Sequence, residues 1–153
     1  MRSRIALGGR ASEEAMPTLY TATASVTGGR EGHAHSDSPK LDLDLRLPKE
    51  MGGPGGEGTN PEQLFAAGYG ACFESALMLV ARTKKIAVKD VVITAKVSLQ
   101  KSDAGAFGLA VELRGKLPGL SKEQAEELMK AAHGVCPYSN ATRGNIEVKL
   151  SVE

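Results

Sequence analysis

The two cysteines of this 153-residue chain, Cys72 and Cys136, are the side chains best suited to redox chemistry. A cysteine thiolate can attack the O–O bond of a peroxide, and a second thiol can capture the resulting sulfenic acid as a disulfide. Cys72 lies in a long apolar stretch, whereas Cys136 follows the predicted end of a helix and precedes Pro137. We therefore expect a sheltered Cys72 and a mobile Cys136, which together could provide both thiols of a peroxidase.

Other uses of the two cysteines are compatible with the same positions. They could be small buried apolar residues that carry no chemistry. The chain has no Cys-x-x-Cys sequence, which argues against a thioredoxin-type motif and against a zinc ribbon. A structural zinc site would need His33, His35 or His133 to converge from distant segments. We expect no metal, and we expect His133 to be a cation in the last turn of its helix, where it would complement the helix dipole.

A reactive Cys72 needs a cation nearby, because it lies well inside its predicted helix and the helix dipole acts only over the first turn. Arg30 follows Gly28 and Gly29 at a predicted turn, and its permanently charged guanidinium group can also hydrogen-bond a peroxide oxygen. Glu62 lies in the first helical turn, where it could orient Arg30 or simply favour the helix start. An arginine in a turn can equally be a solvated side chain.

Glu62 and Cys72 cannot meet on one straight helix. Their positions differ by 10, which corresponds to about 15 Å along the axis, and the two side chains lie on different faces. Three arrangements remain open. Arg30 could span the gap, Gly68 and Gly70 could permit a kink, or the site could be assembled from two subunits.

Two segments carry the start and stop signals of helices. The first is predicted from Pro61 to about Lys84, is apolar on nearly all sides, and should be a buried central helix. The second is predicted over 121–133. The expected capping residues are Asn60 and Gln63 for the first helix, Ser121 and Gln124 for the second, and Gly134 at the end of the second.

Alternating apolar and polar residues predict the strands. The predicted strands are 18–27, 41–47, 88–100, 106–117 and 146–152, with a hairpin between the third and the fourth. Strands grouped around two helices, without regular strand and helix alternation, indicate an α+β fold. We expect a single domain over 17–153, preceded by a loosely ordered N-terminal extension over 1–16.

Composition excludes several classes of partner. The net charge is +1, aromatic residues make up 4% of the chain and tryptophan is absent, so nucleic acid and anionic lipid are not expected. The most apolar run, 64–81, is interrupted by Glu74 and two glycines and is not expected to span a membrane. The N-terminus has no apolar core of a secretory signal. These features favour a cytoplasmic protein.

Three motifs resemble those of the organic hydroperoxide resistance (Ohr) proteins of the Ohr/OsmC family. They are Gly-Gly-Arg-Glu-Gly at 28–32, Thr-Asn-Pro-Glu-Gln-Leu-Phe-Ala-Ala-Gly-Tyr at 59–69 together with Cys72, and Val-Cys-Pro-Tyr-Ser-Asn-Ala-Thr-Arg-Gly-Asn at 135–145. The resemblance covers residues 17–153. It implies an OsmC-like fold with antiparallel sheets around two main helices, in an intertwined homodimer with two active sites at the subunit interface.

The same resemblance implies a role for each candidate site residue. Cys72 matches the peroxidatic cysteine, Cys136 the resolving cysteine, Arg30 the arginine that activates the thiolate, and Glu62 its salt-bridge partner. The implied activity is reduction of alkyl and lipid hydroperoxides without a bound cofactor. The disulfide would be reduced by dihydrolipoyl groups on a lipoylated protein.

Two alternatives stay open at this point. One is an OsmC-like peroxidase with a broader range of substrates, and the other is a non-catalytic dimer that senses redox state or binds a hydrophobic ligand. Leu64, Phe65, Phe73 and Met78 could line an access path for alkyl chains, or they could pack in the core.

Overall fold

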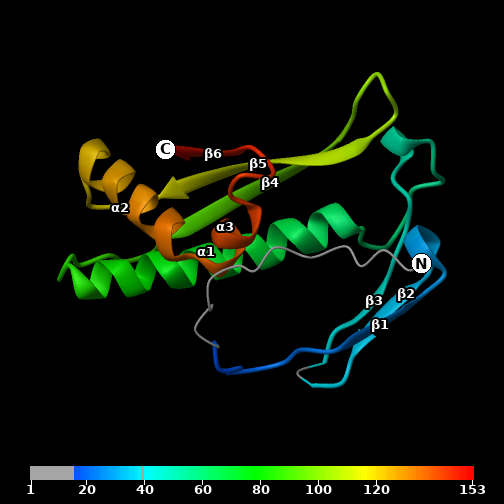
Figure 1. Cartoon of the computed structure of the whole chain (residues 1–153), viewed down its shortest axis with the longest axis horizontal. Coiled ribbons are helices and arrows are strands. Elements are labelled where there is room, and N and C mark those ends of the chain that lie inside the picture. The colour runs from blue at the N-terminus through cyan, green and yellow to red at the C-terminus, as the bar shows by residue number, and fades with distance from the viewer. Residues whose placement is uncertain (1–15, 39) are drawn as a thin grey trace, which may run out of the picture.

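The computed structural model describes residues 16–38 and 40–153 of the chain, so most of the predicted extension over 1–16 lies outside the described residues. Two three-stranded sheets and a long helix organise the molecule (Figure 1). The strands are β1 (Ala24–Thr27), β2 (His33–Ser36), β3 (Asp42–Asp44), β4 (Val92–Lys101), β5 (Phe107–Lys116) and β6 (Val148–Val152). The helices are α1 (Pro61–Thr83), α2 (Lys122–Val135) and α3 (Pro137–Thr142).

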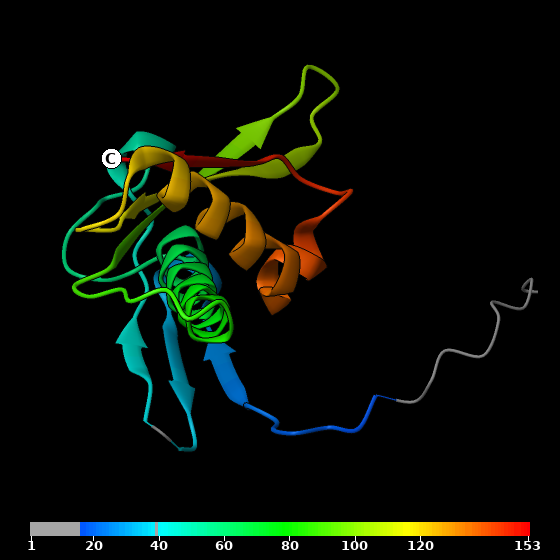
Figure 2. The same ribbon diagram turned by 90° about the vertical axis from the view of Figure 1, so that its left-hand side faces the viewer.

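The C-terminal sheet, β4-β5-β6, covers one side of α1, and α2 packs beside it, as the view along α1 in Figure 2 shows. β4 and β5 form the predicted antiparallel hairpin. β6, in contrast, pairs parallel to β5. Our expectation of antiparallel sheets is wrong for this pair, because the chain crosses back through α2 and α3 and so returns in the same direction.

The N-terminal sheet, β1-β2-β3, is antiparallel and projects away from the C-terminal sheet (Figure 1). The predicted strand over 18–27 begins only at Ala24, because its neighbour β2 is four residues long and offers no partner before that point. The predicted strand over 41–47 is shortened to β3 for the same reason. β2 itself was missed, since His33–Ser36 lacks apolar alternation.

α1 starts as predicted, with the Asn60 side chain accepting a hydrogen bond from the Gln63 backbone N–H at 2.8 Å. The predicted reciprocal bond is absent among the residues described here, because the Gln63 side chain accepts from the Thr59 hydroxyl instead. The capping box of α2 is complete, with both bonds between Ser121 and Gln124. Gly134 does not end α2, which continues to Val135.

One face of α1 forms the centre of the core. Its buried residues follow helical spacing and pack against β4, α2 and α3. The opposite side is less covered, and Leu79 is 54% exposed. The prediction of a helix buried on nearly all sides is therefore wrong for a single chain. The buried residues of α1 are Tyr69, Phe73, Ala76, Leu77 and Ala81.

α1 is also long and apolar enough to cross a membrane, by length and composition alone. The core helix of a soluble protein satisfies the same criterion. Here Phe73 and Leu77 are fully buried in the core cluster that α1 shares with β5 and α2. Core packing therefore accounts for the apolar residues on one face of α1, whereas only 28% of its most apolar window is buried.

Candidate active site

The two cysteines lie side by side, although 64 residues separate them in the chain. Cys72 projects from the middle of α1, and Cys136 occupies the junction between α2 and α3. Their Sγ atoms are 3.7 Å apart, and both thiols are free. This spacing allows a disulfide to form after the sulfur atoms approach to about 2.0 Å.

The exposure of the two thiols is the reverse of our expectation. Cys136 is fully buried, whereas Cys72 is partly exposed. Cys136 is also held on both sides, because its backbone N–H donates to the Ala132 carbonyl and its carbonyl accepts from the Asn140 N–H. The prediction of a mobile Cys136 is wrong because α3 begins immediately after α2 and pins the segment. A small molecule from solvent can therefore reach Cys72 more readily than Cys136.

Within one chain, the surroundings of Cys72 favour the thiol over the thiolate. Burial raises the pKa of Cys72, and a backbone hydrogen bond from Tyr138 only partly opposes this effect. No cation is among the groups that perturb the pKa of this thiol in the described part of the chain. A nucleophilic Cys72 consequently needs a positive charge from elsewhere.

Arg30 and Glu62 form the ion pair that the sequence suggested. Both guanidinium nitrogens donate to the carboxylate, Nη1 to Oε2 at 2.8 Å and Nη2 to Oε1 at 2.6 Å. Arg30 lies in a short 3-10 helix (Gly29–Glu31) between β1 and β2. Gly28 precedes this helix and adopts the left-handed conformation, with φ 70°. The hydrogen bond to Arg30 lowers the pKa of Glu62, so the pair is charged at neutral pH.

This ion pair lies at the N-terminal end of α1, about 15 Å along the axis from Cys72. α1 runs without interruption through Gly68 and Gly70, so no break in the helix shortens the gap. The Arg30 side chain is directed to Glu62, and the Cys72 sulfur is contacted by Cys136 and by the backbone of Tyr138. Within the described chain, therefore, neither a contact from Arg30 to Cys72 nor a break at the two glycines is observed.

An aromatic cluster adjoins the cysteine pair. The ring of Tyr69 lies 6.1 Å from that of Phe65 and 5.6 Å from that of Tyr138, measured between centroids. Phe65 and Tyr138 also line a mainly apolar pocket of about 440 Å³ that extends to Ile146. Of the four residues proposed to line an access path, Phe65 lines this pocket, whereas Phe73 is fully buried in the core.

Sequence reasoning missed a buried group of polar side chains next to Cys136. The Tyr69 hydroxyl is within hydrogen-bond distance of Ser139 Oγ at 2.9 Å and of Thr142 Oγ1 at 3.2 Å. Ser139 Oγ also bonds His133 Nδ1 at 2.8 Å. The one signal that pointed here was a tyrosine within an apolar helix, because a buried tyrosine hydroxyl requires a polar partner.

His133 is not the cation that we expected at the end of α2. Burial lowers the pKa of His133, and the nearby Arg143 acts in the same direction. The cation at the C-terminal end of α2 is Arg143 instead, because its guanidinium group donates to the His133 carbonyl. His133 therefore serves as a neutral hydrogen-bonding group.

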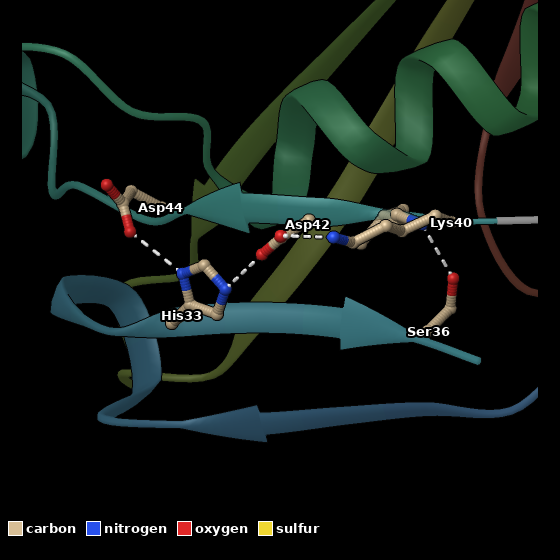
Figure 3. Close-up of polar contacts among 6 residues, drawn as sticks. His33, Ser36, Lys40, Asp42 and Asp44 are labelled. Atoms are coloured by element: carbon tan, nitrogen blue, oxygen red, sulfur yellow. Dashed lines mark hydrogen bonds and ion pairs between the residues drawn. The ribbon is translucent and has the colours of Figure 1, made fainter.

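His33, the other histidine of interest, lies between two carboxylates on the N-terminal sheet (Figure 3). Its Nδ1 is 2.8 Å from Asp44 and its Nε2 is 2.6 Å from Asp42, whereas the His35 ring only stacks beside it. These bonds raise the pKa of His33, with the bond to Asp44 as the largest cause. Across residues 16–38 and 40–153, no group of three or more His, Cys, Asp or Glu could hold a metal ion.

Comparisons with known proteins agree with the motifs and the fold. The family model of OsmC-like proteins matches residues 53–151. An organic hydroperoxide resistance protein of Xanthomonas axonopodis pv. citri is 53% identical over 135 residues, which are 88% of this chain and 94% of that protein.

Two solved structures show the same architecture. An organic hydroperoxide resistance protein from Elizabethkingia anophelis is 54% identical with a TM-score of 0.84, over 90% of this chain and 99% of that one. The organic hydroperoxide resistance protein OhrB of Bacillus subtilis is 47% identical with a TM-score of 0.81, over 89% of this chain and 100% of that one.

Proposed function

Because the chain belongs to the OsmC-like family, in its organic hydroperoxide resistance branch, we propose that it reduces organic hydroperoxides to alcohols through Cys72 and Cys136. A role in hydroperoxide resistance follows from the family. The observation that carries the finer proposal is the pair of free thiols 3.7 Å apart, one partly exposed and one buried. The accessible thiol would attack the peroxide, and the buried thiol would capture the sulfenic acid that results.

The proposed cycle has two oxidative steps. The Cys72 thiolate attacks the distal peroxide oxygen, the O–O bond breaks, and the alkoxide leaves as an alcohol after taking a proton. Cys72 is then a sulfenic acid. The Cys136 sulfur attacks the Cys72 sulfur, and hydroxide leaves as water with the proton of the Cys136 thiol. Rapid disulfide formation would protect Cys72 from further oxidation.

An external dithiol must return the disulfide to two thiols by thiol–disulfide exchange. We propose that this dithiol is a dihydrolipoyl group on a lipoylated protein, as the family resemblance implies, and that the chain needs no bound cofactor. We also place the protein in the cytoplasm, where reducing conditions keep thiols free. The two free cysteines are compatible with that environment.

We propose further that two copies of the chain complete each site. The Arg30–Glu62 pair of the partner subunit would supply the positive charge that Cys72 lacks in its own chain. Arg30 would raise the thiolate fraction and stabilise the leaving alkoxide. The exposure of the N-terminal sheet supports this dimer, because β1 and β3 are exposed along their length and Val26 is 57% exposed.

The pocket at Tyr138, whose backbone hydrogen-bonds Cys72, supports a substrate class, although neither cysteine lines the pocket itself. Its lining residues Phe65, Tyr138 and Ile146 offer apolar surface to an alkyl or aryl chain. Hydrogen peroxide has no such chain and would gain nothing from this surface. We therefore propose that organic hydroperoxides are preferred over hydrogen peroxide.

Steady-state consumption of cumene hydroperoxide and of hydrogen peroxide, each with dihydrolipoamide as the sole reductant, tests the function. Repeated turnover with a strong preference for cumene hydroperoxide is expected. Similar rates on both peroxides would instead favour an OsmC-like peroxidase of broad substrate range. A single turnover followed by arrest with dihydrolipoamide present would indicate a redox sensor.

A further inference from the structure

The polar side chains beside Cys136 form a continuous chain of hydrogen bonds. It runs from His133 Nδ1 to Ser139 Oγ, then to the Tyr69 hydroxyl and to Thr142 Oγ1, with successive distances of 2.8, 2.9 and 3.2 Å. Thr142 Oγ1 finally donates to the Tyr138 carbonyl at 3.0 Å. Tyr69 and Ser139 are both fully buried. Four side chains, three of them buried and His133 half-buried, thus satisfy one another at the edge of the apolar core.

Only one assignment of donors and acceptors satisfies all four of these hydrogen bonds. A carbonyl oxygen can only accept, so Thr142 must donate to it and must accept from Tyr69. Tyr69 then accepts from Ser139, and Ser139 accepts from Nδ1–H of His133. The lowered pKa of His133 fits a neutral ring with its proton on Nδ1.

The positions of these residues relate the chain to both cysteines. His133 lies three residues before Cys136 and Ser139 lies three residues after it, so their bond joins α2 to α3 across Cys136. Tyr69 lies three residues before Cys72 on α1. The hydrogen-bond chain therefore ties the helix that carries Cys72 to both helices that flank Cys136.

We propose that Tyr69, Ser139 and His133 are positioning residues for disulfide formation, which hold Cys136 beside the Cys72 sulfur. This inference rests on the proposed function, because it assigns a role within the second oxidative step. The rate of that step depends on the fraction of molecules in which the sulfur atoms are close. Loss of one hydrogen bond corresponds to about a fivefold change in such an equilibrium.

Tyr69→Phe removes one oxygen atom and keeps the ring in the aromatic cluster. In the otherwise wild-type chain, it is expected to slow disulfide formation about fivefold and to raise the sulfinic acid fraction of Cys72 under excess cumene hydroperoxide. In a Cys136→Ser background, the rate of sulfenic acid formation should be unchanged by Tyr69→Phe. Rapid-quench mass spectrometry of the intact protein measures both steps.

Two substitutions of His133 distinguish the loss of its hydrogen bond from a general loss of packing. His133→Leu is expected to slow disulfide formation as Tyr69→Phe does, whereas His133→Asn, whose side-chain N–H can take the place of Nδ1–H, should restore most of the rate. Leu128→Val is the structural control. It lowers the melting temperature from within α2 without touching the hydrogen-bond chain, and it should leave the sulfinic acid fraction at the wild-type level.

Wild-type disulfide formation in Tyr69→Phe, or equal behaviour of His133→Asn and His133→Leu, would overturn the positioning role while leaving the peroxidase function standing. An equal rise in overoxidation in Leu128→Val would overturn it as well. A wild-type protein that forms no sulfenic acid at Cys72 would instead overturn the peroxidase function and this inference with it.

Discussion

At the scale of single residues, the structure separates the two thiols by accessibility. Cys72 is partly exposed on α1, and Cys136 is buried where α2 meets α3. A buried thiol next to the reacting sulfur is protected from peroxide but is close enough to capture a sulfenic acid. The two side chains are therefore not interchangeable.

Cys72→Ser is expected to abolish peroxide consumption, because no other thiol is accessible among the described residues. Cys136→Ser should release about one alcohol per site as the sulfenic acid forms, and a second alcohol when further peroxide oxidises Cys72 to a sulfinic acid. Counting alcohol released per subunit without reductant measures both outcomes. Alcohol release by Cys72→Ser would show that Cys72 is not the nucleophile.

At the scale of elements, the two sheets differ in how they are stabilised. The C-terminal sheet packs on α1 and α2, whereas the N-terminal sheet exposes β1 and β3 and carries ion pairs and hydrogen bonds between β2 and β3 (Figure 3). The effect of packing can therefore be tested on the C-terminal sheet, and the effect of charge on the N-terminal sheet.

A side chain at Gly115 would have to displace the side-chain ends of Met129 and Leu117, where β5 packs against α2. A Cβ atom there would lie 2.5 Å from the Met129 sulfur and 2.7 Å from a Leu117 methyl group. Gly115→Ala is expected to lower the free energy of unfolding by about 1 kcal/mol, because Met129 and Leu117 are buried and their side-chain ends can shift only partly. Gly108→Ala, on the same strand with nothing within 4 Å of its Cβ, is the control for urea denaturation. Equal loss in both variants would contradict the packing argument.

The bonds of His33 to Asp44 and Asp42 predict a pH dependence of stability. Because its pKa is raised in the folded state, protonated His33 stabilises the fold fully below its unfolded pKa of about 6.5, and this contribution is lost as pH rises through the folded pKa. Urea denaturation between about pH 6 and about pH 9 should show this decline. His33→Gln should lack it, and His35→Gln, which leaves both carboxylate contacts in place, should retain it.

At the scale of the whole molecule, the proposed activating charge of Arg30 and the proposed nucleophile Cys72 lie too far apart within one chain to contact each other. The Arg30–Glu62 pair is at one end of α1 and Cys72 is in its middle. A dimer that presents the N-terminal sheet of one copy to the α1 helix of the other would join them. The exposed apolar residues Leu79 and Val26 fit burial in such an interface.

Mixed dimers test this arrangement directly. Arg30→Ala and Cys72→Ser subunits should each be nearly inactive alone. After subunit exchange in equal amounts, half of the dimers carry one site with both an intact Cys72 and an intact Arg30 of the partner subunit, so about a quarter of the wild-type rate is expected. If Arg30 served the Cys72 of its own chain, every mixed site would carry at least one lesion and the mixture would stay inactive.

Local patterns in the sequence were sufficient for the helix starts at Asn60 and Ser121 and for the β4–β5 hairpin, because caps and alternation act over a few residues. The motifs were sufficient for the family and for nominating four site residues. Tertiary structure decided that Cys136 is buried beside Cys72, that β6 runs parallel to β5, and that His133 bonds Ser139. These features depend on contacts between distant segments or on how α3 folds back against α2, and no local periodicity encodes them.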